Sequence, residues 1–248
     1  MVIDERLSVY INSLLWDIPE YLQETEKKAL EEEVPVIKRS TQTLLAFLLR
    51  MAKPDAVLEI GTAVGFSAML ASEYTSPGTI IDTIEKVPAR IKNAKENFKK
   101  FNKESRINLI EGDANKVLWQ LAEQEKKYGF VFMDAAKGQY MNFAEPVYKM
   151  LVTGGMLVTD NVLQDGDIIQ SRYAVTRRDR TIHSRMREYL YYLSHSEEWD
   201  TIILPVGDGV AVSVKQDSGS TGKSQGQQNG ADYVSKRETR AFSTCQQP

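Results

Sequence analysis

Cysteine and histidine are scarce in this chain of 248 residues, which contains one cysteine, Cys245, and two histidines, His183 and His195. One cysteine excludes an internal disulfide framework and a cysteine-based zinc site, and two histidines leave little for a histidine-rich metal centre. Long apolar runs are also missing, since none approaches the roughly 18 residues of a membrane span, and the acidic start lacks the basic-then-apolar layout of a signal peptide. We therefore expect a cytoplasmic protein that has no membrane partner.

An excess of positive charge is absent as well, because 31 lysines and arginines face 34 aspartates and glutamates, for a formal net charge of -3. This balance argues against a histone-like polycation but leaves room for a local basic patch. From Gln216 to Pro248 the chain is rich in Ser, Gly, Gln and Thr, so it has too little apolar surface to offset the entropy lost on ordering. We expect residues 216–248 to form a disordered low-complexity tail; the alternative is a linker to a short docking helix around Tyr233 to Phe242.

Helical and strand-like patterns alternate before this tail. The spacing of apolar residues predicts helices at 3–15, 19–33, 40–51, 67–74, 88–101, 114–124, 140–151 and 179–195, and strands at 56–60, 79–84, 107–111, 130–133, 156–159, 201–206 and 210–214. Strands that alternate with helices predict an α/β fold, with a parallel sheet covered on both faces. The last two strands flank Gly207-Asp208-Gly209, a tight turn, so the sheet should end in an antiparallel β-hairpin.

The residues after the first three strands favour an adenosine ligand, because ligands of open parallel sheets lie beyond the carboxyl ends of the strands. Gly61 and Gly65 permit a tight turn, but the missing middle glycine of G-x-G-x-x-G weakens the case for a pyrophosphate. Glu85 stands where an acid would bind a ribose diol, and Asp113 follows the third strand, where it could accept from an adenine amino group. Each motif alone could be an ordinary turn; together they favour a nucleoside.

Two further strands end in Asp134 and in Asp160-Asn161. If these strands are neighbours, two carboxylates and an amide oxygen open into one crevice. Such an oxygen-only set suits Mg²⁺, and the absence of Cys or His nearby disfavours zinc. The alternative is that Asp134 caps the following helix and Asp160 forms a turn.

The motifs VLEIGTAVGFSA, TIEK, EGDA, VFMDAAKGQY and VTDNVL resemble those of class I S-adenosylmethionine-dependent methyltransferases. More narrowly, they resemble the cation-dependent O-methyltransferase family that includes catechol and caffeoyl-CoA O-methyltransferases. The resemblance covers about residues 3–215 and implies a single methyltransferase domain (1–215), in which N-terminal helices (1–53) precede a Rossmann-like core (54–215) with a seven-stranded, mostly parallel sheet. It also implies S-adenosylmethionine as cofactor, Mg²⁺ or another divalent cation such as Mn²⁺, and a homodimer.

The resemblance also assigns roles to individual residues. The cation would be held by Asp134, Asp160 and Asn161. The cofactor pocket would be lined by Ile37, where relatives often carry Met, and by Glu59, Gly61, Ser67, Glu85, Asp113, Ala114 and Asp134. Lys137 is the candidate general base, because a neighbouring divalent cation favours its neutral form; the alternative is a surface lysine that contacts phosphate. Asp134 would serve catalysis as well as binding.

A cluster of arginines bears on the acceptor substrate. Six arginines follow the strand that ends in Asp160-Asn161: Arg172, Arg177, Arg178, Arg180, Arg185 and Arg187. Lys38 and Arg39 could extend this basic patch. Arginine clusters suit phosphate recognition, although a solvated helix face is the alternative.

The motifs DAAKGQYMNF, TDNVLQDG and PVGDG resemble bacterial tRNA 5-hydroxyuridine methyltransferases. We therefore expect methylation of the wobble 5-hydroxyuridine in the tRNA anticodon loop, which gives 5-methoxyuridine. The alternative is a small-molecule O-methyltransferase for catechols or phenolic thioesters. A nucleotide-binding oxidoreductase fits less well, because its glycine motif is absent.

Overall fold

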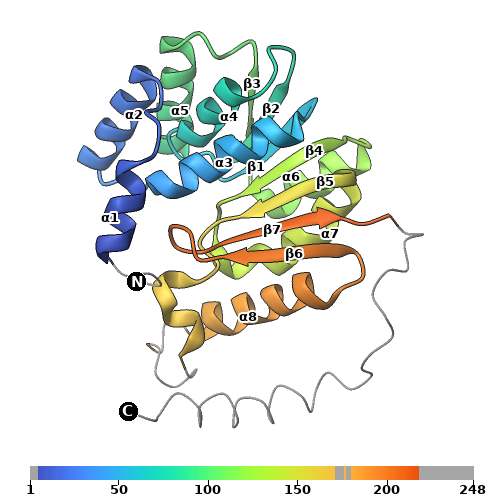
Figure 1. The fold of residues 1–248 in the computed structure, drawn as a ribbon. Coiled ribbons are helices and arrows are strands. Elements are labelled where there is room, and N and C mark those ends of the chain that lie inside the picture. Colours follow the sequence, from blue (N-terminus) through green and yellow to red (C-terminus); the bar gives the residue numbers. More distant parts are fainter. Residues whose placement is uncertain (1–4, 171–175, 177–179, 218–248) are drawn as a thin grey trace. The chain divides into compact units, whose positions relative to one another are not determined.

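The computed structural model describes residues 5–170, 176 and 180–217 (Figure 1). Within them, seven strands form one sheet in the order β3-β2-β1-β4-β5-β7-β6. The bounds are β1 (Ala56–Ile60), β2 (Ile80–Glu85), β3 (Ile107–Glu111), β4 (Tyr128–Met133), β5 (Leu151–Thr159), β6 (Trp199–Leu204) and β7 (Val210–Lys215). The strands from β1 to β5 pair in parallel, whereas β7 is antiparallel to both β5 and β6. The predicted fold class is therefore confirmed, including the terminal hairpin.

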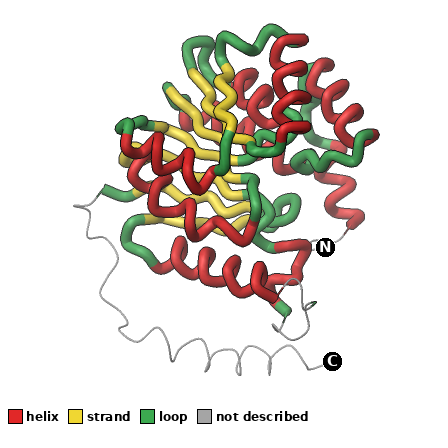
Figure 2. Tube along the Cα trace, turned by 180° about the vertical axis from the view of Figure 1, so that it is seen from behind, coloured by secondary structure: helices red, strands yellow, loops and turns green. Residues whose placement is uncertain are grey.

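Helices cover both faces of this sheet (Figures 1 and 2). One face packs against the helices α2 (Glu20–Glu31), α3 (Arg39–Ala52), α4 (Phe66–Tyr74) and α5 (Pro88–Lys100). The other face packs against α6 (Ala114–Glu123), α7 (Tyr140–Met150) and α8 (Arg180–His195). Alternate strand residues supply the two cores: Val57 and Ile81 face the first group, and Leu58 and Ile84 the second. This alternation follows from the two-residue period of side chains along a strand.

Several predictions about local structure were wrong. The strand β5 (Leu151–Thr159) begins five residues before the predicted 156–159, and the helices α1 (Glu5–Ser13) and α2 each end two residues before the predicted boundary. The spacing of apolar residues in the helix predicted at 40–51 also places Phe47 on its buried side, yet Phe47 is 52% exposed. The short 3₁₀ helices η1 (Lys137–Gln139) and η2 (Gln164–Ile169) were not predicted. A pattern of apolar residues indicates a helix face, but it does not tell which apolar residues find a neighbour to pack against.

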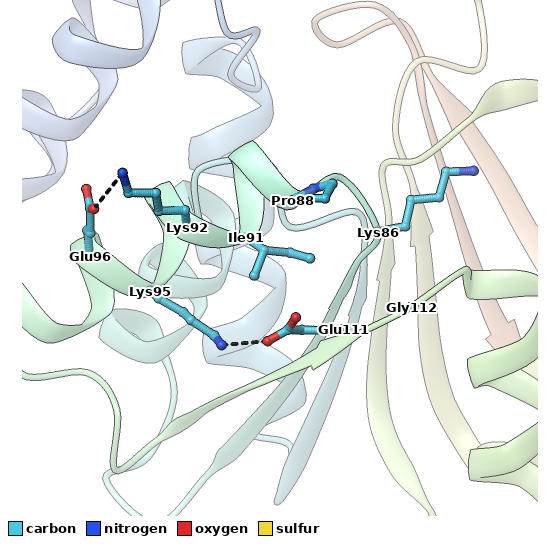
Figure 3. A pocket seen from close by; sticks show the side chains of 8 residues that line it. All are labelled: Lys86, Pro88, Ile91, Lys92, Lys95, Glu96, Glu111 and Gly112. Carbon is cyan, nitrogen blue, oxygen red and sulfur yellow. Dashed lines mark hydrogen bonds and ion pairs between the residues drawn. The ribbon is translucent and has the colours of Figure 1, made fainter.

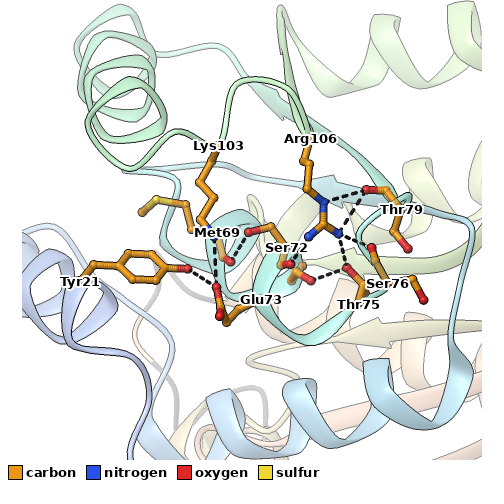
Figure 4. A network of polar contacts seen from close by, with 10 residues as sticks. Tyr21, Met69, Ser72, Glu73, Thr75, Ser76, Thr79, Lys103 and Arg106 are labelled. Atoms are coloured by element: carbon orange, nitrogen blue, oxygen red, sulfur yellow. Dashed lines mark hydrogen bonds and ion pairs between the residues drawn. The ribbon is translucent and has the colours of Figure 1, made fainter.

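A polar network fixes the end of α4 against the elements around it (Figure 4). Arg106 donates to the backbone carbonyls of Ser72, Ser76 and Thr79 and to the hydroxyl of Thr75. Nearby, Glu73 accepts from Tyr21 at 2.9 Å and from Lys103 at 3.1 Å. The tyrosine lies on α2, so this carboxylate links α2 to α4. The network thereby supports the segment after α2, which lines the cleft described below.

Other predictions are left without a test. Among the described residues, no helix is long and apolar enough to cross a membrane. The N-terminal part of the chain exposes large apolar side chains, which are Leu7, Val9, Tyr10, Ile11 and Leu14. The homodimer remains a prediction, because no second chain is present to cover them. The predicted tail lies outside the described residues from Ser218 onward.

Candidate active site

A cleft of about 820 Å³ lies at the carboxyl ends of the parallel strands. It opens beside β1, which pairs with β2 on one side and with β4 on the other, so the strand order reverses at this point. Open α/β sheets bind their ligands at such a switch point. Most of the predicted site residues line this one cleft: Ile37, Lys38, Gly61, Ser67, Glu85, Asp113, Ala114, Asp134, Lys137, Asp160 and Asn161.

Gly61 begins the loop after β1 and has a φ of +104°, a conformation that residues with a side chain rarely adopt. A Cβ atom at this position would overlap the carbonyl oxygen of Asp134. The glycine therefore lets the loops after β1 and β4 approach each other. The sequence predicted a tight turn here, but it gave no sign that the neighbour would be the loop that carries the first metal-binding candidate.

Glu85, at the end of β2, is held in place by backbone amides. Its carboxylate accepts from the N–H groups of Ala63 at 3.0 Å, Lys86 at 2.8 Å and Val87 at 3.0 Å. An ionised carboxylate has about four acceptor sites, so these bonds orient the group and leave capacity for a ligand hydroxyl. The predicted ribose-binding acid thus has a fixed orientation at the edge of the cleft.

Asp113 caps the N-terminus of α6, where its side chain accepts from the backbone N–H of Asn115 at 2.9 Å. It also forms an ion pair with Lys86 at 3.2 Å. These hydrogen bonds lower the pKa of the Asp113 carboxyl, so it is ionised near neutral pH. The sequence analysis gave an ordinary turn as the alternative for this residue; in the structure it is a helix cap whose carboxylate lines the cleft next to Ala114.

Glu59 lies on β1 beneath the cleft and is 2% exposed. Its Oε2 accepts from the hydroxyl of Thr83, whereas its Oε1 is buried without a hydrogen-bond partner. Burial raises the pKa of Glu59 to about 8, and the hydroxyls of Ser67 and Thr83 oppose this shift. Glu59 does not line the cleft directly, in contrast to the other predicted cofactor residues.

Asp134 and Asp160 stand at the ends of the neighbouring strands β4 and β5, as predicted. Burial raises the pKa of Asp134, and burial together with the charge of Asp134 raises the pKa of Asp160 to about 7. Asn161 follows with a φ of +64°, and it also lines the cleft. The parallel register therefore brings the three predicted metal-binding residues into one place.

These residues fit a hard divalent cation. Oδ1 of Asp160 is buried without a hydrogen-bond partner, and an unpartnered buried oxygen is costly unless a ligand satisfies it. Two carboxylates that repel each other, beside an amide oxygen, form the oxygen-only set that Mg²⁺ prefers. The described residues hold no cluster of three or more His, Cys, Asp or Glu suited to a metal, so the third donor here would be the amide of Asn161.

Lys137, in η1, lies against this group. Its Nζ donates to Oδ1 of Asn161 at 2.9 Å, and its charge opposes the raised pKa of both Asp134 and Asp160. The candidate base is therefore within hydrogen-bond reach of a metal-binding candidate.

Asp208, in the turn between β6 and β7, lines the same cleft and forms an ion pair with Lys38. Its charge raises the pKa of Asp134 and Asp160. The sequence analysis used this residue only as part of a turn motif. No local pattern could have linked it to the site, because its partner Lys38 lies 170 positions away in the sequence.

Only three of the six predicted RNA-binding residues lie in the described part of the chain, so the predicted group remains a prediction. Lys38 lines the cleft, whereas Arg39 donates to the carbonyl of Trp16 and pairs with Asp17 at 3.3 Å. Arg180 begins α8. The remaining three, Arg172, Arg177 and Arg178, lie outside the described residues.

A smaller depression of about 580 Å³ lies beside the cleft, between α5 and the end of β3 (Figure 3). Three lysines line it, but two of them pair with acids in the same depression: Lys95 with Glu111 at 2.5 Å and Lys92 with Glu96 at 3.9 Å. Exposed pairs of this kind contribute little energy. The depression therefore gives no sign of a separate site.

Comparisons with known proteins agree with this geometry. The chain is 28% identical over 169 residues to the tapetum-specific methyltransferase 1 of Arabidopsis thaliana, covering 68% of this chain and 72% of the relative. It is 29% identical over 174 residues to the caffeoyl-CoA O-methyltransferase of Stellaria longipes, covering 67% and 70%. Among solved structures, the S-adenosylhomocysteine-bound methyltransferase PaMTH1 of Podospora anserina matches with a TM-score of 0.75 and 27% identity, covering 86% of this chain and 95% of that one.

A family model of O-methyltransferases matches residues 7–216, which include every described strand and every residue of the cleft. The family resemblance inferred from the strand-end motifs is thereby confirmed. The chain belongs to the O-methyltransferase family.

Proposed function

We propose that the protein transfers the methyl group of S-adenosylmethionine, with the help of a divalent cation such as Mg²⁺ or Mn²⁺, to a hydroxyl that has a second oxygen on the neighbouring carbon. The observation that carries the proposal is the pair Asp134 and Asp160, at the ends of neighbouring strands, beside Asn161 and Lys137. Membership of the O-methyltransferase family indicates the reaction class. The oxygen atoms of Asp134, Asp160 and Asn161 are suited to a divalent cation, and an acceptor with two neighbouring oxygens could bind to that cation.

The cofactor would lie at the end of the cleft formed by the loops after β1, β2 and β3. S-adenosylmethionine supplies a methyl group on a positively charged sulfur, and PaMTH1, described as bound to S-adenosylhomocysteine, supports this cofactor. In this chain, the amide-held carboxylate of Glu85 would bind the ribose hydroxyls, and Asp113 with Ala114 would border the adenine. Ile37, which is 6% exposed, would close the cleft from the N-terminal side.

The acceptor would lie at the other end of the cleft. Asp134, Asp160 and Asn161 would hold the cation, whose charge, when bound, lowers the pKa of a neighbouring hydroxyl. The amine of Lys137 would accept the proton that the acceptor hydroxyl releases. These residues hold the acceptor oxygen close to the methyl group, and positioning of this kind can supply about 7–11 kcal/mol of the barrier.

A phenol with two neighbouring hydroxyls is the first substrate class that we propose. The caffeoyl-CoA O-methyltransferases among the relatives support it. These names match the small-molecule alternative of the sequence analysis better than its tRNA prediction.

The wobble 5-hydroxyuridine of tRNA is a second candidate, and one observation favours it. Arg185, on α8, donates to the carbonyl of Gly138 at 3.0 Å, so a guanidinium lies beside the segment that carries Lys137. Arg180 and Arg187 lie on the same helix. Arginines at the mouth of an active site suit the phosphates of an RNA loop, and 5-hydroxyuridine also has two neighbouring oxygens.

One experiment tests the reaction and separates these substrates. The full chain is incubated with S-adenosylmethionine and Mg²⁺, together with either caffeoyl-CoA or tRNA that carries 5-hydroxyuridine, and the products are analysed by mass spectrometry. We expect one substrate to gain the mass of one methyl group. A gain on neither would contradict the proposed reaction on these acceptors.

Two controls define the result. Chelation of divalent cations by EDTA should abolish the gain, and added Mg²⁺ should restore it; activity that survives EDTA would contradict the role of the cation. Salt distinguishes the two acceptors, because tRNA binding should weaken steeply with salt as counterions are released, whereas binding of a small phenol should not.

A further inference from the structure

The turn between β6 and β7 connects two walls of the cleft. On one side, the backbone N–H of Val162 donates to the carbonyl of Gly209, and that of Leu163 to the carbonyl of Asp208, both at 3.0 Å. Val162 and Leu163 directly follow the metal-binding candidates. On the other side, the carboxylate of Asp208 forms an ion pair with Lys38, which directly precedes α3. The turn therefore joins the cofactor side of the cleft to the loop after β5.

Two glycines fix the turn in this place. Gly207 has a φ of +59°, and a Cβ atom there would overlap the hydroxyl oxygen of Thr41 on α3. Gly209 has a φ of +88°, and a Cβ atom there would overlap the side chain of Leu163. Gly207 thus packs closely against α3, and Gly209 packs closely against the loop after β5. Asp208, which lies between the two glycines, therefore has little freedom to move.

Asp208 lines the same cleft as the metal-binding candidates Asp134, Asp160 and Asn161. Its side chain is 16% exposed, so Asp208 adds a third carboxylate to the cleft that Asp134 and Asp160 line. The positive groups Lys137 and Arg90 line the same cleft. A third negative charge in a poorly solvated cleft attracts a cation more strongly than the same charge in water.

We propose that Asp208 is a positioning residue of the cation site. Its charge adds to that of Asp134 and Asp160 and strengthens cation binding, its backbone carbonyl holds the loop that presents Asn161, and Lys38 keeps its carboxylate in place. The inference rests on the proposed function, because it assumes that this group of residues binds a divalent cation.

The test measures cation binding directly, without turnover. Mn²⁺ is titrated into the full chain, and free Mn²⁺ is measured by electron paramagnetic resonance. Loss of a residue that supports metal ligands typically weakens binding by about 10- to 100-fold, so we expect Asp208→Asn to raise the dissociation constant about 10-fold or more. Asp208→Glu, which keeps the charge, should recover part of the affinity. Equal affinities for the asparagine variant and the unaltered protein would overturn the proposal.

Two further variants separate a specific effect from a general one. Asp200, at the other end of β6, is exposed and accepts from Gln216 at 2.6 Å, so Asp200→Asn should leave Mn²⁺ affinity unchanged. Lys38→Met tests whether Lys38 acts by its charge or by holding Asp208. If only the positive charge matters, its loss should strengthen Mn²⁺ binding; if Lys38 holds the carboxylate of Asp208 in place, its loss should weaken Mn²⁺ binding. We expect weaker binding; stronger binding would overturn the role assigned to Lys38.

Failure of this inference and failure of the proposed function give different results. If the unaltered protein binds no Mn²⁺, the cation site itself is refuted. If the unaltered protein binds Mn²⁺ and Asp208→Asn binds it equally well, only the role of Asp208 is refuted. Thermal melting of each variant in the absence of cation shows that a loss of affinity does not come from unfolding.

Discussion

Between pH 6 and pH 8, Glu59 should lower the free energy of unfolding of the ligand-free protein by about 2 kcal/mol, and Glu59→Gln should abolish this fall. Glu59 is 2% exposed, and burial raises its pKa from 4.5 to about 8. In the unfolded chain the group has an ordinary pKa of about 4.3, so between these two values the folded state holds a proton that the unfolded state does not. Its contribution to stability is therefore fully present at low pH and is lost as the pH rises through about 8.

The size of the effect follows from the same two values. Stability falls by about 1.4 kcal/mol for each pH unit while the folded state alone is protonated, and the fall becomes smaller as the pH approaches the folded-state pKa. Between pH 6 and pH 8 the sum is about 2 kcal/mol. Glutamine has the same shape as the protonated acid and does not titrate, so Glu59→Gln lacks this contribution.

The assay is urea unfolding at pH 6, 7 and 8, without cofactor or cation, for the unaltered protein, Glu59→Gln and a control. Glu111→Gln is the matched control, because Glu111 ends the strand β3 on the same sheet but has a side chain that is 52% exposed. The control should keep the pH dependence of the unaltered protein. If Glu59→Gln also keeps it, Glu59 is ionised in the folded protein, and the argument from burial is refuted.

Four further changes have expected outcomes. Asp160→Ala should abolish methyl transfer while S-adenosylhomocysteine affinity, measured by calorimetry, largely survives; loss of cofactor affinity would contradict its place at the cation end of the cleft. Lys137→Met should slow turnover at saturating substrate by about 100-fold or more, as expected for a general base, and a rate within a few fold of normal would exclude that role. Gly61→Ala should lower stability in urea unfolding by about 1–3 kcal/mol, because it strains a positive φ and overlaps the carbonyl of Asp134; unchanged stability would show that the loop can move away. Arg106→Ala should cost about 2–3 kcal/mol through its lost hydrogen bonds at the end of α4, and a thermal melt that does not shift would refute this.

The sequence by itself determined the alternation of strands and helices and the edge of the sheet at which ligand-binding residues gather. Strands that alternate with helices must form a parallel sheet, and the carboxyl ends of parallel strands share one edge. For this reason Asp134 and Asp160, at the ends of two successive strands, were expected to meet if the strands are neighbours; the structure pairs these strands, and both residues line one cleft. The resemblance to the O-methyltransferase family was inferred from the motifs at these strand ends, where the ligand-binding residues of an open α/β sheet lie.

Only the tertiary structure decided which distant residues complete the site. The ion pair between Lys38 and Asp208 joins residues 170 positions apart, and no local pattern encodes it. The overlap that forbids a side chain at Gly61 depends on the loop after β4, and Phe47 is exposed although its helical spacing predicts burial. Periodicity records which side of an element is apolar, whereas contacts between elements depend on how their surfaces pack, and packing is fixed only when the whole chain has folded.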